Sequence, residues 1–336
     1  MIISKEESSA LNSLRFLCII TLVFHHTQVD HLAPDVELSS LLRNVHQVLS
    51  LPFLPILFFL SGYLFFYSRH ENQTSIPVSL WLSTTYVQKT KKRIKSLLIP
   101  YIIWSIISII YVSTIKHTEI KIHSPWDIII LLWDTGNGSP IGLALWYIRN
   151  LLVFAILSPV YFIVVKYLKH ITLFLLLMLQ ALKIPVDFPY FNEYLLLGSY
   201  LSLMEISVEK ATSYFNWKLC LLGYIICKIS PFLFDIPQVN GFVVISLGII
   251  LLMGLLMKKP IPYKYTVAST FIYLMHPYLT GIRNIFIKYG DSSSIVQDIL
   301  IWFATALTVL LICYGAFYFL KQFAPKLLSV VSGGRV

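Results

Sequence analysis

Charged residues are scarce in this sequence. Only 12% of its 336 residues are Asp, Glu, Lys or Arg, whereas soluble globular domains carry roughly 25%. Hydrophobic residues make up 57%, and the mean hydropathy is +0.75. A water-soluble fold of this length has too few charges to cover its surface. We therefore predict an all-α, polytopic membrane protein that lies in the lipid bilayer.

Cysteine is also rare, and the four cysteines offer neither a metal site nor a disulfide framework. Cys18, Cys220, Cys227 and Cys313 all fall within apolar stretches and lack the spacing of metal ligands. We interpret them as small buried residues and expect no bound metal. The sequence has no internal repeat, and no small-residue cleavage site follows its first apolar run. That run is therefore expected to remain as the first helix.

Long apolar runs, by contrast, are frequent. A membrane-spanning helix needs about 20 mostly apolar residues, and this criterion predicts ten spans in a single transmembrane domain over residues 1–336. The predicted spans are 12–30, 51–68, 97–116, 142–165, 170–184, 190–205, 218–234, 240–257, 266–286 and 298–320. The fifth, sixth and seventh are short or interrupted by proline, so a count of nine or eleven is the alternative.

The basic residues predict the orientation of the chain. The formal net charge is +10, but the basic residues lie in short segments between apolar runs rather than on one soluble face. We therefore predict no nucleic-acid partner. With ten spans and a cytoplasmic N-terminus, most of the 26 basic residues fall in inner segments, as the positive-inside rule requires. This predicts a multi-pass protein of the cell membrane with both termini in the cytoplasm.

Two ionisable residues of the first predicted span share one face of the helix. Arg15 and His26 are eleven positions apart, so they differ by roughly 20° in direction and lie about 16 Å apart along the axis, whereas His25 is about 80° off that face. Asp30 follows one turn after His26, where its carboxylate can orient the imidazole. Because charge at membrane depth is expensive, Arg15 and His26 are candidate functional residues. The alternative is that Arg15 reaches the cytoplasmic headgroups and His26 lies at the outer interface.

Three further polar features are candidates for function. The basic run at residues 89–95, predicted as a loop before the third span, is either a positive-inside anchor or a phosphate site for a polyanionic cofactor. Arg149 lies beside Trp146 in the fourth span, either in an interfacial belt or at a site. His276 lies near the middle of the ninth span. Pro277 follows directly, which favours a segment that faces protein or water rather than lipid.

Taken in order, these residues resemble the acyltransferase-3 family of integral membrane acyltransferases, most of them bacterial. The matching motifs are Leu14-Arg15 with His26, Phe58-Phe59-Leu60-Ser61-Gly62-Tyr63, the basic run ending Leu98-Ile99-Pro100-Tyr101, Leu145-Trp146-Tyr147-Ile148-Arg149 with Ser158-Pro159, and Tyr273-Leu274-Met275-His276-Pro277. Two positions depart from the family pattern. Asn12 stands where an acidic residue is common, and Ser96 stands where a second arginine follows Arg93 by three residues.

The resemblance implies an O-acyltransferase of the bacterial cytoplasmic membrane that takes acetyl from acetyl-CoA and transfers it to a hydroxyl of a lipid-linked or cell-surface glycan. By motif, His26 and Arg15 are the expected catalytic residues. Arg93, with Lys92 and Lys95 in place of the missing arginine, is expected to bind the acyl-CoA. The expected acceptor-site residues are Trp146, Arg149, Tyr273, His276, Ser61 and Asp30. The alternative function is a transporter or flippase of a glycan or small anionic substrate, which the lack of an internal repeat disfavours.

Overall fold

The protein is built from helices, as its computed structural model shows. The structure describes residues 4–28, 53–67, 73–115, 120, 122–135, 140–142, 144–181, 192–234, 241–289 and 295–334. The elements are α1 (Lys5–His26), α3 (Phe53–Phe66), η2 (Gln73–Ser75), α4 (Val78–Trp81), η3 (Leu82–Tyr86), α5 (Val87–Thr114), α6 (Pro125–Trp133), α7 (Leu145–Leu168), α8 (His170–Ala181), α9 (Asn192–Leu203), α10 (Val208–Ser213), α11 (Trp217–Phe234), α12 (Gly241–Leu256), α13 (Tyr263–Thr266), α14 (Ser269–Met275), η4 (His276–Tyr278), α15 (Ile282–Tyr289), α16 (Ile295–Phe323) and α17 (Pro325–Val331). No strand occurs within these ranges, which confirms the all-α prediction.

Several of the described helices can cross a membrane. Four are long and apolar enough: α1, α7, the helical stretch Val78–Thr114 that contains α5, and Val296–Phe323 of α16. The helix α3 and the stretch Ile245–Leu256 of α12 are shorter but also apolar. On α5, the exposed side chains of Ile102, Ile106 and Ile110 follow one another at one-turn spacing. Lipid rather than water covers such a face, so the membrane assignment holds, while the count of ten spans remains a prediction.

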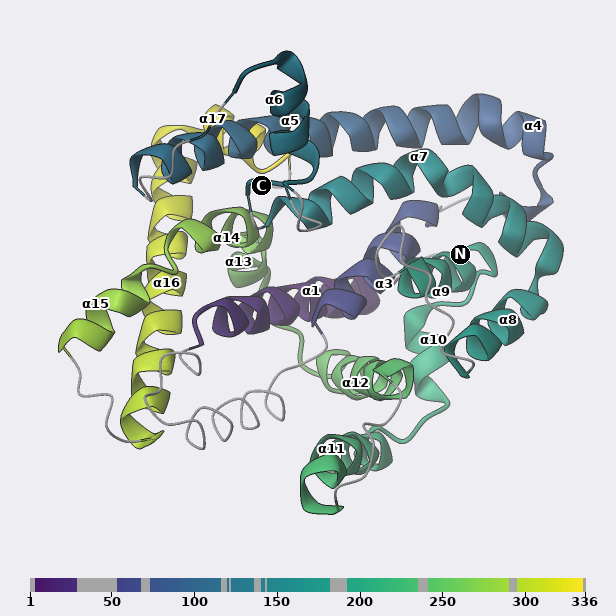
Figure 1. Ribbon diagram of the computed structural model, residues 1–336. Coiled ribbons are helices and arrows are strands. Elements are labelled where there is room, and N and C mark those ends of the chain that lie inside the picture. The colour runs from purple at the N-terminus through teal and green to yellow at the C-terminus, as the bar shows by residue number, and fades with distance from the viewer. Residues whose placement is uncertain are drawn as a thin grey trace.

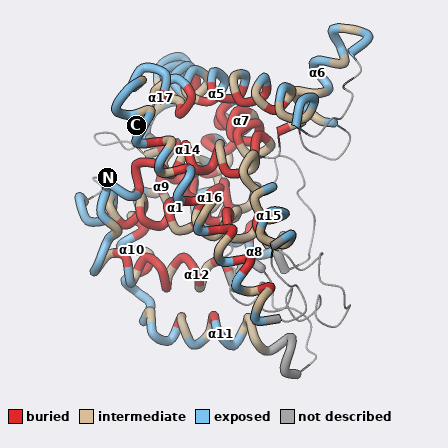
Figure 2. Tube along the Cα trace, turned by 90° about the vertical axis from the view of Figure 1, so that its left-hand side faces the viewer, coloured by how far each residue is buried: buried red, intermediate tan, exposed pale blue. Residues whose placement is uncertain are grey.

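The core lies where α1, α3, α7 and α9 pack together (Figure 1). Figure 2 shows buried residues along α1, α7 and α9 in the middle of the molecule, and mainly exposed residues on α6 at its edge. The arrangement places Arg15 and His26 of α1, both half-buried, among the other helices.

Two glycines set the close packing of α3 against α9. A Cβ atom on Gly62 would lie 2.2 Å from the carbonyl oxygen of Leu195, and one on Gly198 would lie 2.1 Å from that of Phe59. Small residues at a crossing let membrane helices approach to backbone contact. Gly62, part of the motif at residues 58–63, therefore serves helix packing.

A buried carboxylate ties three helices together near the start of α1. Glu7 is 1% exposed, and its Oε1 accepts hydrogen bonds from Tyr63 Oη at 3.1 Å and from the backbone N–H of Val208 at 2.8 Å. Tyr63 lies on α3 and Val208 begins α10. A carboxylate at a helix N-terminus satisfies otherwise unpaired N–H groups. Glu7 thus fixes the end of α1 that leads toward Arg15.

The basic run is helical, so the prediction of a loop there is wrong. The helix α5 begins at Val87, well before the predicted start of the span at residue 97, and residues 89–95 form its first two turns. Hydropathy excludes cations from a span, but Lys, Arg and Gln are good helix formers, and nothing in the run breaks a helix. The run therefore directs its side chains to opposite faces of one rigid helix.

The ninth predicted span, 266–286, is not one continuous helix. The helix α14 ends at Met275, the 3-10 turn η4 follows, and α15 begins at Ile282. Pro277 accounts for the break, because it lacks an N–H and its ring blocks the preceding helical turn. His276, just before it, is fully buried, as expected for a segment that faces protein.

The helix α6 is not among the predicted elements. Its N-terminus is a capping box, in which Ser124 Oγ accepts from the N–H of Asp127 at 3.4 Å and Asp127 Oδ2 accepts from the N–H of Ser124 at 2.8 Å. The N–H of His123 donates to the same carboxylate, and these backbone hydrogen bonds lower the pKa of Asp127. The nine residues of α6 are apolar but too few to cross a membrane, so the length criterion for spans does not predict this helix.

Candidate active site

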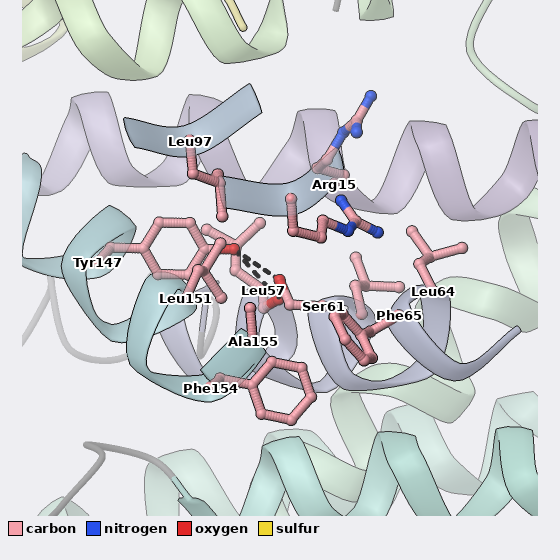
Figure 3. A pocket seen from close by; sticks show the side chains of 12 residues that line it. Arg15, Leu57, Ser61, Leu64, Phe65, Leu97, Tyr147, Leu151, Phe154 and Ala155 are labelled. Carbon is pink, nitrogen blue, oxygen red and sulfur yellow. Dashed lines mark hydrogen bonds between the residues drawn. The ribbon is translucent and has the colours of Figure 1, made fainter. Parts of the chain in front are cut away.

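A cavity of about 200 Å³ lies between α1, α3, α5 and α7. Arg15 and Arg93 both line it, although they are far apart in sequence, together with the hydroxyl groups of Ser61 and Tyr147. Its remaining wall is apolar, with Leu57, Leu60, Leu64, Phe65, Leu97, Leu151, Phe154 and Ala155. Figure 3 shows Arg15, Ser61 and Tyr147 at this space, with dashed lines for the hydrogen bonds of the two hydroxyls. Two guanidinium groups in an otherwise apolar cavity favour a ligand that carries negative charge.

Arg15 is oriented by a neutral group of its own helix. Its Nη2 donates a hydrogen bond to Asn12 Oδ1 at 3.2 Å. Asn12 is the position where the resemblance noted in the sequence predicts an acidic residue. An amide at this position directs the guanidinium without cancelling its charge, so the positive potential of the cavity is kept.

The two hydroxyls of the cavity are held by the backbone of α3. Ser61 Oγ donates to the carbonyl of Leu57 at 2.8 Å and lies 2.9 Å from Tyr147 Oη. Tyr147 Oη is also within 3.3 Å of the same carbonyl. Each hydroxyl has one proton and lies within hydrogen-bonding distance of the Leu57 carbonyl, so either hydroxyl can donate in the bond between them. Both are thereby fixed at the cavity wall.

The predicted site histidines, His26 and His276, lie at the C-terminal end of α1, away from Arg15. The ring centroids of His26 and His276 are 5.1 Å apart, whereas His25 packs against Phe53 at 5.4 Å. The structure thus brings His26, the histidine on the face of Arg15, to His276. Tyr273 lies between this pair and the arginine cavity, with its ring 6.1 Å from His276 and 5.4 Å from Tyr147.

The backbone assigns the tautomer of His276. Its Nδ1 lies 2.8 Å from the carbonyl oxygen of Tyr273 and 3.1 Å from that of Ile272. Carbonyl oxygens only accept, so Nδ1 carries a proton. In the neutral ring, Nε2 is then an acceptor, and it is buried with no hydrogen-bond partner among the described residues. His276 therefore presents a lone pair in the region of His26 instead of a donor for an oxyanion.

A comparison of the sequence with protein families identifies the family of this chain. A family model for the acyltransferase domain matches residues 8–318 of the 336-residue chain. This chain belongs to the acyltransferase-3 family. No curated protein and no solved structure matches it. The match includes both the arginine cavity and the histidine pair, so the site described above belongs to a membrane acyltransferase.

Within the acyltransferase, the cations of the basic run divide between two faces of α5. Arg93 lines the cavity, whereas Lys92 and Lys95 are exposed on the other side of the helix and line none of the described cavities. The inward lysine is instead Lys89, one turn before Arg93, whose Nζ donates to the carbonyls of Phe65 and Tyr67 at 3.0 and 3.2 Å. In a helix, residues four positions apart lie on the same face, so Lys89 and Arg93 are both expected to point inward.

Arg149 of the acyltransferase contacts α6 rather than the arginine cavity. It is 3% exposed, its Nη1 donates to the carbonyl of Trp133, and its guanidinium lies 5.5 Å from the Trp133 ring centroid. A cation at the last carbonyls of a helix interacts favourably with the helix dipole. The Tyr101 hydroxyl donates to the neighbouring carbonyl of Leu132. Arg149 and Tyr101 together dock α6 on the membrane helices.

The remaining predicted site residues differ in how well they are placed. Trp146 packs on α3, with its ring centroid 6.1 Å from that of Phe58, and lines neither of the two cavities that contain Arg15. Tyr273 donates its hydroxyl proton to the carbonyl of Ala144, which fixes its ring between the two parts of the site. Asp30 lies outside the described residues. No group of three His, Cys, Asp or Glu side chains suitable for a metal ion occurs in the described part of the acyltransferase.

Proposed function

We propose that this acyltransferase transfers an acetyl group from cytoplasmic acetyl-CoA to a sugar hydroxyl of a lipid-linked or cell-surface polysaccharide, in the bacterial cytoplasmic membrane. The observation that carries the proposal is the cavity that Arg15 and Arg93 line together. Arg15 lies on the face of α1 that also carries His26. Family membership favours acyl transfer over the alternative of a transporter or flippase.

The donor is expected to bind by its charged end. Guanidinium groups bind phosphate oxygens with two parallel hydrogen bonds, and a low-dielectric surrounding strengthens each of them. Arg15 and Arg93 would hold the phosphates of acetyl-CoA, and its long pantetheine arm would extend along α1. His26 lies about 16 Å from Arg15 along the helix axis, so the thioester can reach the histidines while the phosphates stay at the arginines.

The chemical step needs a base at the acceptor hydroxyl. In the proposed step, a ring nitrogen of His26 takes the hydroxyl proton while the hydroxyl oxygen attacks the thioester carbonyl carbon. The tetrahedral intermediate then collapses, the carbon–sulfur bond breaks, and the departing CoA sulfur takes the proton from His26. The products are the acetyl ester and CoA. In the substrate complex, His276 Nε2, which makes no hydrogen bond in the described structure, would accept one from the second ring N–H of His26 and so hold the imidazole with its basic nitrogen toward the acceptor.

The experiment that tests this function compares His26→Ala with the matched variant His25→Ala. Removing a general base lowers the rate roughly 10²- to 10⁴-fold, so His26→Ala should abolish acetylation of surface glycans, whereas His25→Ala should retain most of it. Glycan acetyl content is measured by mass spectrometry in cells with equal membrane levels of each protein. Equal loss in both variants contradicts the assignment of His26.

A further inference from the structure

The C-terminal segment beyond the family match forms part of the cavity system. This segment, Pro325 to Gly333, contains α17 and lies outside the matched residues 8–318. It packs along α5, where Trp104 Nε1 donates to the carbonyl of Val331 at 3.0 Å. The contact joins residues 227 positions apart in sequence, so the segment is anchored to the body of the protein at a defined place (Figure 1).

A second, smaller cavity lies between this segment and Arg15. It measures about 50 Å³, and its polar lining comes from Arg15, Ser96, Tyr147, Thr270, Tyr273 and Ser332. Arg15 and Tyr147 also line the larger cavity, so the two spaces meet at these side chains. One water needs only about 10–15 Å³ measured in this way, so the smaller cavity has room for several ligand atoms.

Ser332 supplies this cavity with an unused hydrogen-bonding group. The residue is 1% exposed, and its Oγ has no hydrogen-bond partner in the described part of the chain. A buried hydroxyl is normally paired, so the Ser332 hydroxyl is available to hydrogen-bond a molecule in the cavity. Beside Arg15, a hydroxyl donor fits an oxygen atom of an anionic group.

The backbone after α17 is shaped to bring Ser332 to this place. Gly333 has φ +67°, and a Cβ atom there would lie 2.1 Å from the carbonyl oxygen of Ser96 on α5. Glycine is therefore required both for the left-handed conformation and for the close approach. Ser96 is the position of the family's second arginine, and here the C-terminal segment covers it.

We propose that this segment is a wall of the donor site, and that Ser332 Oγ donates a hydrogen bond to a phosphate oxygen of the acyl donor that Arg15 also binds. The inference rests on the proposed function, because it takes acetyl-CoA as the donor. It adds a binding residue from a part of the chain that the family match does not include. It also gives the chain a hydroxyl donor close to the position where its relatives have an arginine.

Equilibrium binding of radiolabelled acetyl-CoA to the purified full-length protein in detergent tests the inference. Ser332→Ala should raise the Kd roughly tenfold, since a hydrogen bond to a charged group contributes at least one factor of ten. Ser332→Thr, which keeps the hydroxyl, should recover part of the affinity. The melting temperature of Ser332→Ala should stay equal or rise, because the substitution removes an unpaired buried hydroxyl. A purely structural role predicts the opposite.

A matched pair of glycine variants gives an independent measurement. Gly333→Ala and Gly334→Ala introduce the same strain, since Gly334 also has positive φ (+72°), but nothing lies within 4 Å of a Cβ at Gly334. Only Gly333→Ala should displace the segment and weaken acetyl-CoA binding. If wild-type protein binds acetyl-CoA and neither Ser332→Ala nor Gly333→Ala changes the Kd, the inference is overturned and the proposed function stands. If wild-type protein binds no acetyl-CoA, both are overturned.

Discussion

At the scale of single residues, hydrogen bonds within the protein fix the orientation of Arg15 and the protonation of the His276 ring. Asn12 orients Arg15 without neutralising it, and the carbonyls of Ile272 and Tyr273 fix the His276 tautomer. The sequence predicted that Arg15 and His26 share a face, because helix geometry relates any two positions of one helix. It could not predict the partner of His26, since the pairing with His276 depends on a break at Pro277 far along the chain.

The tautomer of His276 leads to a prediction with two matched variants. His276→Asn keeps a donor for the backbone carbonyls but has no group at the position of Nε2, whereas the longer side chain of His276→Gln can place an acceptor oxygen there. If Nε2 orients His26, kcat should fall roughly ten- to hundredfold in the Asn variant and less in the Gln variant. The KM for acetyl-CoA should change little in either, because the proposed site of the donor phosphates is at the arginines.

Steady-state kinetics of the two purified variants make this measurement, with acetylation of an acceptor glycan as the readout. A decrease in kcat that is larger for Gln than for Asn indicates that the backbone bonds of Nδ1 matter more than Nε2. That result contradicts the role proposed for the lone pair.

At the scale of helices, most apolar elements were predictable and the mixed ones were not. Hydropathy locates α1, α3, α7 and α16, because each buries or exposes a long apolar surface. It misses the first turns of α5, which are basic but helical, and the surface helix α6, which depends on the capping box at Ser124. It also places a single span over residues 266–286, because an average over many residues does not register one proline.

The two faces of α5 predict unequal roles for its cations. Arg93→Ala should raise the Kd for acetyl-CoA roughly tenfold, because it removes a charge-assisted contact in the cavity. Lys91→Ala, which neutralises an exposed residue of the same run, should leave the affinity close to that of wild type. Donor titration at two salt concentrations measures both, and the difference should shrink at high salt as screening increases. Equal effects would mean that the run acts only through its total charge.

The crossing of α3 and α9 predicts a stability effect that depends on position. Gly62→Ala or Gly198→Ala forces a methyl group onto a backbone carbonyl, and overpacking of this kind costs about 1–3 kcal/mol. Gly315→Ala on α16 adds the same methyl group where nothing lies within 4 Å, so it should be neutral or slightly stabilising. Melting temperatures in detergent should therefore fall for the first two variants only. A similar decrease for Gly315→Ala would show that the loss of glycine itself, rather than the crossing, is responsible.

At the scale of the whole molecule, the site joins parts from both ends of the chain. The cavities take residues from α1, α3, α5, α7 and α14 and from the segment after α17. Such long-range neighbours follow from how the helices pack, which the sequence of any single helix does not contain. The sequence motifs identify the residues of the site. The fold places them in a row, from the arginine cavity through Tyr147 and Tyr273 to His26 and His276.

The orientation of the molecule gives the last prediction, because acetyl-CoA is made only in the cytoplasm. Most basic residues fall in the predicted inner segments, so Lys92 and Lys259 should face the cytoplasm, whereas Trp126 on α6 and Lys288 on α15 should face outward. Each is replaced singly by cysteine in a Cys227→Ser background, since the other three native cysteines are buried. In intact spheroplasts a membrane-impermeant maleimide should label only the cysteines at positions 126 and 288. Labels at positions 92 and 259 should appear only after permeabilisation. Labelling of Lys92→Cys in intact spheroplasts would place the start of α5, and with it Arg93, on the side of the membrane where no CoA exists, and the proposed donor site would have to be abandoned.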